Sequence, residues 1–186
     1  KISVDSSTMV NKIFEIIEAK KIFSLSYRQL EIIIHPKSYV HAIIKFKDGM
    51  IKIIAHETTM QIPISNTLSS KNLGNFETKK INLKKLNQLQ LSKISKKQFP
   101  LTKIINQLPE NYSLFETILV SINDELVKLF LNKKISYTNL IKKLLKFVSS
   151  KDFYKYKFIE PKKIDDILNL NNYIKSKIFN HEKNIK

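Results

Sequence analysis

A polar group near the start of the chain has the residue types that bind a phosphate and a metal ion: Ser6, Asn11, Lys12 and Glu15. A hydroxyl, an amide and an ammonium can hold a phosphate at a helix N-terminus, where free N–H groups and the helix dipole favour an anion. Glu15 follows Lys12 by three positions, so a helix would place its carboxylate one turn further along the same side. Carboxylates are preferred ligands of hard divalent cations. The same spacing also fits a capped amphipathic helix with a solvated polar face, so both interpretations stay open here.

The surrounding residues predict the elements that would position this group. Residues 2–4 are β-prone, and the run over 5–8 consists of helix N-cap residue types. Apolar side chains then recur at the spacing of an amphipathic helix, at Val10, Ile13, Phe14 and Ile17. The sequence therefore predicts a short strand, a cap and a helix over 8–23.

A block with β character follows. The sequence predicts a short strand over 31–35 and two longer strands over 39–47 and 50–55. Asp48-Gly49 between the longer strands is a signal for a two-residue hairpin turn.

After a polar, Lys-rich connection over 69–98, the sequence predicts helices for the rest of the chain. Apolar residues at helical spacing predict helices around 101–108, 115–130, 140–148 and 164–178. Short connections between them favour an antiparallel bundle.

The predicted fold class is α+β, a small sheet with helices followed by an all-α helical bundle domain. The predicted division is a catalytic and dimerisation block over 1–68, a linker over 69–98 and a C-terminal helical domain over 99–186.

The chain has 33 basic and 16 acidic residues, a net charge of +17. A large positive charge is typical of proteins that bind nucleic acids. The type of basic residue argues against this function, because Arg28 is the only arginine in the chain. Proteins that recognise bases or bind phosphates with two hydrogen bonds favour arginine. The lysines are also spread along the chain, and they accompany many Ile and Asn residues, which indicates AT-rich codons. The composition therefore disfavours a nucleic-acid partner.

Other classes are excluded more directly. The chain has no cysteine, which excludes disulfides, Cys-ligated zinc and a cysteine nucleophile. It has no apolar run long enough for an ordinary transmembrane helix and no secretory signal, so we expect no membrane partner and a cytosolic setting. His35 and His41 flank Pro36, and we expect them to make structural hydrogen bonds rather than a metal pair.

Several blocks of the chain resemble one enzyme family. The segment DSSTMVNKIFEIIEAKKIF resembles the metal- and substrate-binding helix of 1-deoxy-D-xylulose 5-phosphate reductoisomerases, typically DSATMMNKGLE followed by an IEA-type run. The segment EIIIHPKSYVHAIIKFKDG resembles the family's hairpin segment. Further blocks that resemble the family are HETTMQIPISNTL, FPLTKI, SINDELVKLFL and EPKKIDDILNLNNYIKSKI. They occur in family order over nearly the whole chain, so the chain resembles the C-terminal half of such an enzyme.

The resemblance implies a function. The family converts 1-deoxy-D-xylulose 5-phosphate to 2-C-methyl-D-erythritol 4-phosphate with NADPH and Mn²⁺ or Mg²⁺, in non-mevalonate isoprenoid biosynthesis. By matching position, Ser6, Asn11 and Lys12 would bind the phosphorylated substrate. Glu15 would be the catalytic metal ligand and touch the substrate, and Met60 would line the active site. The resemblance also implies a homodimer formed through the hairpin, in a bacterial cytoplasm or a plastid-type organelle.

The chain also departs from the family pattern. Ile13 stands where the family has Gly, which would crowd a turn near the ligand, and the W-P-x-R element expected after Leu68 is absent. The chain contains no G-x-G-x-x-G loop and no D-S-E motif. We therefore expect a fragment or trimmed product whose NADPH-binding domain and further metal ligands would precede Lys1, and which is inactive alone.

An alternative from another class stays open at this point. A catalytically inactive or repurposed module could bind a partner or a polyanion through its basic charge. A dinucleotide fingerprint and a D-S-E motif ahead of Lys1 would distinguish the enzyme from this module.

Overall fold

A computed structural model describes residues 1–68, 80 and 82–183, and the chain divides into two compact units. The helical unit comprises Lys1–Glu31 and Ser95–Lys186, and the strand unit comprises Ile32–Ile94. This division differs from the predicted boundaries near 68 and 98. The physical reason is that the first helices of the chain pack with helices of its second half, which separates them from the strands that follow in sequence.

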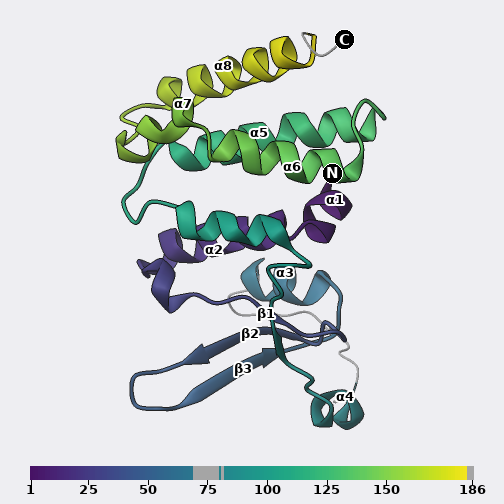
Figure 1. Cartoon of the computed structure of the whole chain (residues 1–186). Helices are drawn as coiled ribbons and strands as arrows, with labels where there is room; N and C mark the ends of the chain where they lie inside the picture. The colour runs from purple at the N-terminus through teal and green to yellow at the C-terminus, as the bar shows by residue number, and fades with distance from the viewer. Residues whose placement is uncertain (69–79, 81, 184–186) are drawn as a thin grey trace. The chain divides into compact units, whose positions relative to one another are not determined.

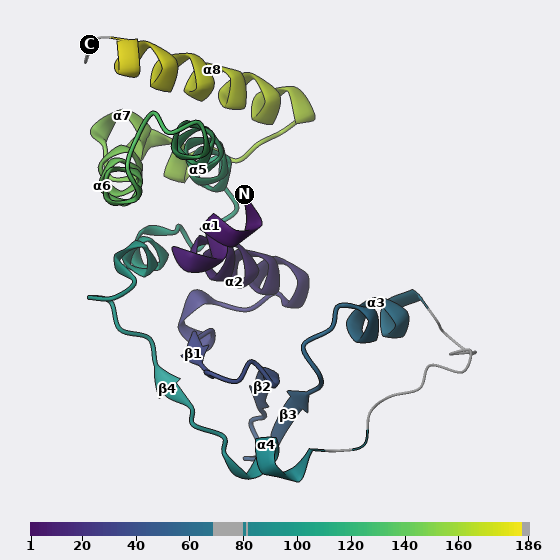
Figure 2. The ribbon, with the colours of Figure 1, turned by 90° about the vertical axis from the view of Figure 1, so that its right-hand side faces the viewer.

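The helical unit contains the following elements: α1 (Ile2–Ser7), α2 (Val10–Phe23), the 3₁₀ helix η1 (Tyr27–Gln29), the 3₁₀ helix η2 (Pro100–Gln107), α5 (Phe115–Leu131), α6 (Tyr137–Val148), α7 (Lys151–Tyr154), the 3₁₀ helix η3 (Lys155–Phe158) and α8 (Ile164–Lys183). The central helix is α5, which packs against both α6 and α8 (Figure 1). Figure 2 shows α5 and α6 side by side, nearly end-on, with α8 running across. The predicted helices of the second half are therefore confirmed, and the first of them, η2, is a 3₁₀ helix.

The predicted strand at residues 2–4 is wrong, because these residues begin the helix α1. The backbone N–H groups of Val4 and Asp5 donate to the carbonyl of Lys1 at 2.9 and 3.0 Å, which is helical pairing. The hydroxyl of Thr8 donates to the carbonyl of Val4 at 2.9 Å and so satisfies the end of α1. Val4 and Asp5 are buried in this helix, so tertiary contacts override the β preference of the residue types here.

The predicted N-cap over 5–8 is also wrong, because these residues end α1 instead of capping α2. The N-cap of α2 is Met9, whose φ of 64° is left-handed, and no side chain caps the helix. This left-handed residue separates α1 from α2.

The apolar face predicted for α2 is largely confirmed. Val10 and Ile13 are fully buried, and Ile17 is 7% exposed. Ile16 is buried as well, whereas Phe14 is only partly covered. Ile13 therefore packs into the core in the interior of a regular helix, and the expectation that it crowds a turn near a ligand is wrong.

The strand unit contains β1 (Ile33–Ile34), β2 (Val40–Lys45), β3 (Ile51–Ala55), α3 (Gln61–Leu68), α4 (Leu83–Asn87) and β4 (Ser92–Lys93). In its described part, β1 pairs with β4 and β2 pairs with β3, both antiparallel. The α+β class is thus confirmed, with two small sheets in place of one. The strand β4 belongs to this unit although it lies in the predicted linker, and 69–79 and 81 of that linker lie outside the described residues.

The hairpin of β2 and β3 turns through three residues, so the predicted two-residue turn is wrong. The N–H of Phe46 donates to the carbonyl of Met50 at 2.9 Å, and the N–H of Gly49 donates to the carbonyl of Phe46 at 3.1 Å. Gly49 has a φ of 91°, a conformation that glycine adopts without strain. Asp48 accepts from the N–H of Met50 at 3.0 Å. A turn closed by a left-handed glycine is the usual three-residue hairpin.

The hairpin is rich in isoleucine, and the described residues of its unit leave these side chains exposed on both faces. Ile43 and Ile44 on β2 are 36% and 41% exposed, and Ile51, Ile53 and Ile54 on β3 are between 46% and 57% exposed. Side chains on both faces of the two strands are therefore open to solvent in the described structure. Elsewhere, none of the described helices is long and apolar enough to cross a membrane.

Replacing Ile13 by the Gly of the family pattern should destabilise the helical unit by about 3 to 5 kcal/mol. The change removes a fully buried side chain and adds backbone freedom inside α2. Urea unfolding measures the loss. Ile22→Gly is the matched control, because Ile22 lies on the same helix at 72% exposure and should cost only about 1 kcal/mol. Equal effects of the two changes would contradict the burial of Ile13.

Candidate functional site

Three of the residues predicted to bind substrate and metal lie together on the outer face of α2. The ammonium Nζ of Lys12 is 2.7 and 3.0 Å from the two carboxylate oxygens of Glu15. The amide Nδ2 of Asn11 donates to the same carboxylate at 3.3 Å. The side chains of Lys12 and Glu15 are each 48% exposed, so the group is open to solvent. Its proximity follows from helical spacing, and its role in binding stays a prediction.

Ser6 lies near the end of α1, and the left-handed Met9 separates it from the helix α2 that carries this group. Its side chain is exposed, and its carbonyl accepts from the N–H of Met9 at 3.1 Å, which links the end of α1 to the start of α2. Within the described residues no hydrogen bond joins the Ser6 hydroxyl to Asn11, Lys12 or Glu15. Because α2 begins without a side-chain cap, its first N–H groups lack the usual side-chain acceptor. Such a helix start can receive an anion.

A buried hydrogen bond holds α1 against α5. The amide Nδ2 of Asn123 donates to Oδ1 of Asp5 at 2.8 Å, and these residues are 0% and 4% exposed. At the surface, Lys1 forms an ion pair with Asp124 at 2.6 Å. This bond raises the pKa of Lys1. The segment that carries Ser6 is therefore attached to α5 by one buried and one exposed contact.

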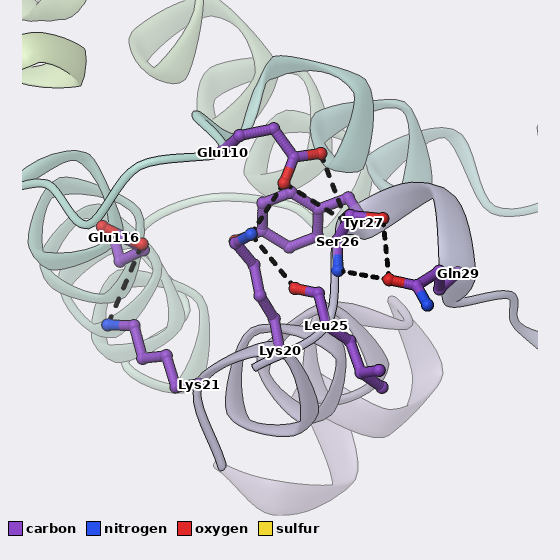
Figure 3. Close-up of polar contacts among 8 residues, drawn as sticks. All are labelled: Lys20, Lys21, Leu25, Ser26, Tyr27, Gln29, Glu110 and Glu116. Carbon is purple, nitrogen blue, oxygen red and sulfur yellow. Dashed lines mark hydrogen bonds and ion pairs between the residues drawn. The ribbon is translucent and has the colours of Figure 1, made fainter. Parts of the chain in front are cut away.

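The other end of α2 is attached by Glu110, in the loop between η2 and α5 (Figure 3). Its carboxylate accepts from Lys20 Nζ at 2.7 Å and from the backbone N–H of Tyr27 at 3.2 Å. Lys20 also donates to the carbonyl of Leu25 at 3.2 Å and lies 4.7 Å from the centre of the Tyr27 ring. One carboxylate thus joins the last turn of α2, the following η1 and the approach to α5.

These contacts shift two titration equilibria. The hydrogen bond from Lys20 holds the pKa of Glu110 below its usual value. Burial, together with the negative charges of Glu116 and Glu110, raises the pKa of Tyr27. Glu116 itself lies 3.8 Å from Lys21.

The donor set for a metal is incomplete in the part of the chain that the structure describes. No three His, Asp or Glu side chains gather there to hold an ion. Glu15 offers one carboxylate, and Mg²⁺ needs several oxygen ligands. The chain can therefore contribute a ligand to a metal site but does not contain a complete one in its described residues.

Met60 belongs to the strand unit and lies directly before α3, with 70% exposure. Its place at the active site stays a prediction. In the same unit, His41 stacks on His56 with ring centres 3.6 Å apart, and its Nε2 lies 3.2 Å from the His56 carbonyl. The ring nitrogens of His35 are buried and have no hydrogen-bond partner among the described residues, so the structural hydrogen bond expected there is not observed.

The sequence-based prediction missed Asn123 and Glu110 as residues that hold the site helix. The signal for Asn123 is present, because a polar residue interrupts the apolar positions of α5 beside Ile122 and Leu126. No comparable signal marks Glu110, whose partners lie far away in sequence.

The fold is that of solved reductoisomerase structures. A structure titled 1-deoxy-D-xylulose 5-phosphate reductoisomerase from Zymomonas mobilis in complex with NADPH matches 97% of this chain and 47% of its own, with TM-score 0.81 and 24% identity. A DOX-P reductoisomerase in complex with magnesium matches 100% of this chain and 47% of its own, with TM-score 0.85 and 24% identity. Another, with NADPH, fosmidomycin and magnesium, matches 98% of this chain, with TM-score 0.84 and 25% identity.

The sequence comparisons give the family. A family model described as DXP reductoisomerase C-terminal domain matches residues 56–177. A Pelagibacter ubique (strain HTCC1062) protein named 1-deoxy-D-xylulose 5-phosphate reductoisomerase is 52% identical over 96% of this chain and 46% of its own length. A Clostridium perfringens (strain 13 / Type A) protein of the same name is 31% identical over 96% of this chain and 45% of its own length. The chain belongs to the 1-deoxy-D-xylulose 5-phosphate reductoisomerase family, and it spans about half the length of the curated relatives it matches.

Glu110→Gln should lower the stability of the helical unit at neutral pH, by no more than about 1 kcal/mol because this carboxylate is half exposed and screened. Since folding lowers the pKa of Glu110, its contribution is fully present above the unfolded value near 4.5 and is lost as pH falls through the folded value. The difference between parent and variant, measured by urea unfolding, should therefore vanish at low pH. Glu18→Gln, at an exposed position of α2, is the control and should change stability little at any pH. A Glu110→Gln difference that persists at pH 2 would contradict the ionic origin.

Proposed function

We propose that this chain supplies the C-terminal half of a 1-deoxy-D-xylulose 5-phosphate reductoisomerase. The enzyme converts 1-deoxy-D-xylulose 5-phosphate to 2-C-methyl-D-erythritol 4-phosphate with NADPH and Mn²⁺ or Mg²⁺, in non-mevalonate isoprenoid biosynthesis. The observation that carries the proposal is the group of Asn11, Lys12 and Glu15 at the uncapped start of α2, in a chain of this family.

The substrate phosphate and hydroxyls fit the positive and polar side of this group. Lys12 supplies a full positive charge, while Asn11 and Ser6 supply an amide and a hydroxyl. The first N–H groups of α2 add donors directed along the helix axis. Without ligands Lys12 is paired with Glu15, so a bound phosphate would take over Lys12 and leave the carboxylate of Glu15 for a cation.

Glu15 is the one metal ligand that we assign to this chain, and the other ligands would come from the half of the enzyme that the chain does not span. A bound Mn²⁺ or Mg²⁺ supplies Lewis-acid polarisation of substrate oxygens. The carboxylate of Glu15 is exposed and lies 2.7 Å from the Lys12 ammonium, so we place the metal beside the bound phosphate. We also place Met60 against the substrate, as the resemblance implies.

We propose that the protein works in the cytoplasm of a bacterium or in a plastid-type organelle. The bacterial origin of the relatives supports the first of these locations. We also propose that NADPH binds to a part of the enzyme outside this chain. The Zymomonas mobilis structure is a complex with NADPH that this chain matches over 47% of that protein's length. We therefore assign substrate and metal binding to this half, and the nicotinamide site to the part of the enzyme that the chain does not span.

The proposal is tested by joining this chain to the N-terminal half of the Pelagibacter ubique relative. We expect NADPH oxidation that depends on 1-deoxy-D-xylulose 5-phosphate and on Mn²⁺, whereas each half alone should show none. The natural Pelagibacter ubique enzyme is the positive control. A folded chimaera without turnover would contradict the proposal and favour the inactive basic module.

In this chimaera, Glu15→Gln should lower turnover by about 10²-fold or more, because the variant keeps the shape but removes one charge from the metal. Lys12→Ala should instead raise KM for the phosphorylated substrate more than it weakens Mn²⁺ activation. Steady-state kinetics with substrate and Mn²⁺ varied separately distinguish the two. The assignment is wrong if the two variants behave alike or if Glu15→Gln is silent.

We also propose a homodimer formed through the β2–β3 hairpin. Its apolar side chains lie exposed, and an uncovered strand edge favours pairing with a second copy. Light scattering at tens of micromolar should give twice the monomer mass, and Ile51→Lys with Ile53→Lys should shift it to the monomer. Leu83→Lys, at an exposed position of α4, is the control and should leave the dimer intact. A monomer mass for the parent chain would contradict this proposal.

A further inference from the structure

We propose that Asn123 is a positioning residue that acts through Asp5 to hold Ser6 at the substrate phosphate. Asn123 would not touch the substrate. The inference rests on the proposed function, because the role of Ser6 is part of that proposal.

The first observation is the burial of the pair. Asn123 is fully buried on α5, Asp5 is 4% exposed on α1, and their hydrogen bond is 2.8 Å long. A carboxylate removed from water is costly unless it is paired, so the amide of Asn123 selects the position of α1 in which the bond is made. Displacement of α1 by even one ångström would leave this carboxylate without its donor.

The second observation is that the other polar contacts between α1 and residues of the second half of the chain are weak. The ion pair of Lys1 and Asp124 is exposed at both ends, at 48% and 34%, and such pairs contribute little. The hydroxyl of Tyr137 reaches Ser7 at 3.4 Å, which is a long hydrogen bond. A helix as short as α1 does not hold itself together, so its position depends on tertiary contacts. The Asp5–Asn123 bond is the buried polar member of these contacts.

The third observation is that Asn123 places a polar amide at a buried position of α5, where packing alone would favour an apolar side chain. Most buried positions of α5 are apolar, as at Ile122 and Leu126, and the buried hydroxyl of Ser121 is satisfied within the helix itself. An unpaired amide in such a place lowers stability, and the Oδ1 atom of Asn123 has no hydrogen-bond partner among the described residues. The hydrogen bond that the Nδ2 group of Asn123 donates to Asp5 gives a reason for an amide at this position, even though its Oδ1 atom is unpaired.

The effect of losing this bond should reach Ser6 and leave Glu15 in place. Ser6 follows Asp5 directly in α1, whereas Glu15 lies on α2, which is fixed by its own buried face and by the contact of Lys20 with Glu110. The geometry therefore predicts a selective loss of phosphate binding with metal activation retained. A general loss of folding would affect both.

The test uses the chimaera with the Pelagibacter ubique N-terminal half. Asn123→Ala should raise KM for 1-deoxy-D-xylulose 5-phosphate about tenfold, with kcat and the Mn²⁺ concentration for half-activation changed less than about twofold. Hydrogen exchange of the peptide covering residues 1–9 should speed up about tenfold, while exchange within 13–20 of α2 stays as in the parent. The reciprocal variant, Asp5→Asn with Asn123→Asp, keeps one donor and one acceptor and should bring KM back to within about threefold of the parent.

Ser121→Ala is the matched control. It removes a buried hydroxyl of the same helix whose 2.7 Å bond to the Thr117 carbonyl stays within α5, so KM should not change. An unchanged KM in Asn123→Ala, an equal rise in Ser121→Ala, or no recovery in the reciprocal variant would each overturn the inference alone. A parent chimaera without turnover would instead overturn the proposed function, and the assignment of Ser6 with it.

Discussion

The buried face of α2 is the constraint on which the candidate site depends. Val10, Ile13, Ile16 and Ile17 are covered, and side chains of a helix have fixed directions around its axis. Once that face is buried, Lys12 and Glu15 are turned to solvent on the other side, one turn apart. Hydrophobic burial in the core thus determines where a charged pair can meet a ligand, and the polar residues themselves contribute little to folding.

A helix that carries a binding site must also be fixed along its axis, and the two ends of α2 are fixed differently. The start is joined to α1 through the left-handed Met9, and α1 is held by the buried pair of Asp5 and Asn123. The end is held by Glu110, an exposed carboxylate with several donors. The buried contact lies beside the predicted phosphate site, where misplacement by an ångström is most costly for binding.

Much of this arrangement could be predicted from the sequence, because α2, α5, α6 and α8 have long apolar periods that local patterns reveal. The α1 helix could not, because it is short, it begins with β-prone residue types, and its tertiary contacts include Asn123, far along the chain. The grouping of segments into the two units likewise depends on contacts that are distant in sequence. Segments far apart in sequence pack together in the helical unit, and local composition does not predict which segments these are.

The grouping of Asn11, Lys12 and Glu15 was predictable because helical spacing alone brings these side chains together. The turn of the hairpin shows the limit of such signals. Asp48-Gly49 marks a turn correctly, but the left-handed Gly49 closes a three-residue loop, and that choice depends on the pairing of Phe46 with Met50.

The central claim is that the outer face of α2 presents Glu15 to a catalytic metal beside the substrate phosphate. A crystal of the chimaera grown with Mn²⁺ and substrate tests it through the anomalous signal of manganese. We expect an anomalous peak at about 2.1 Å from a carboxylate oxygen of Glu15, with the Lys12 ammonium turned to the phosphate. A manganese peak bound only by residues outside this chain, with Lys12 still paired to Glu15, would contradict it.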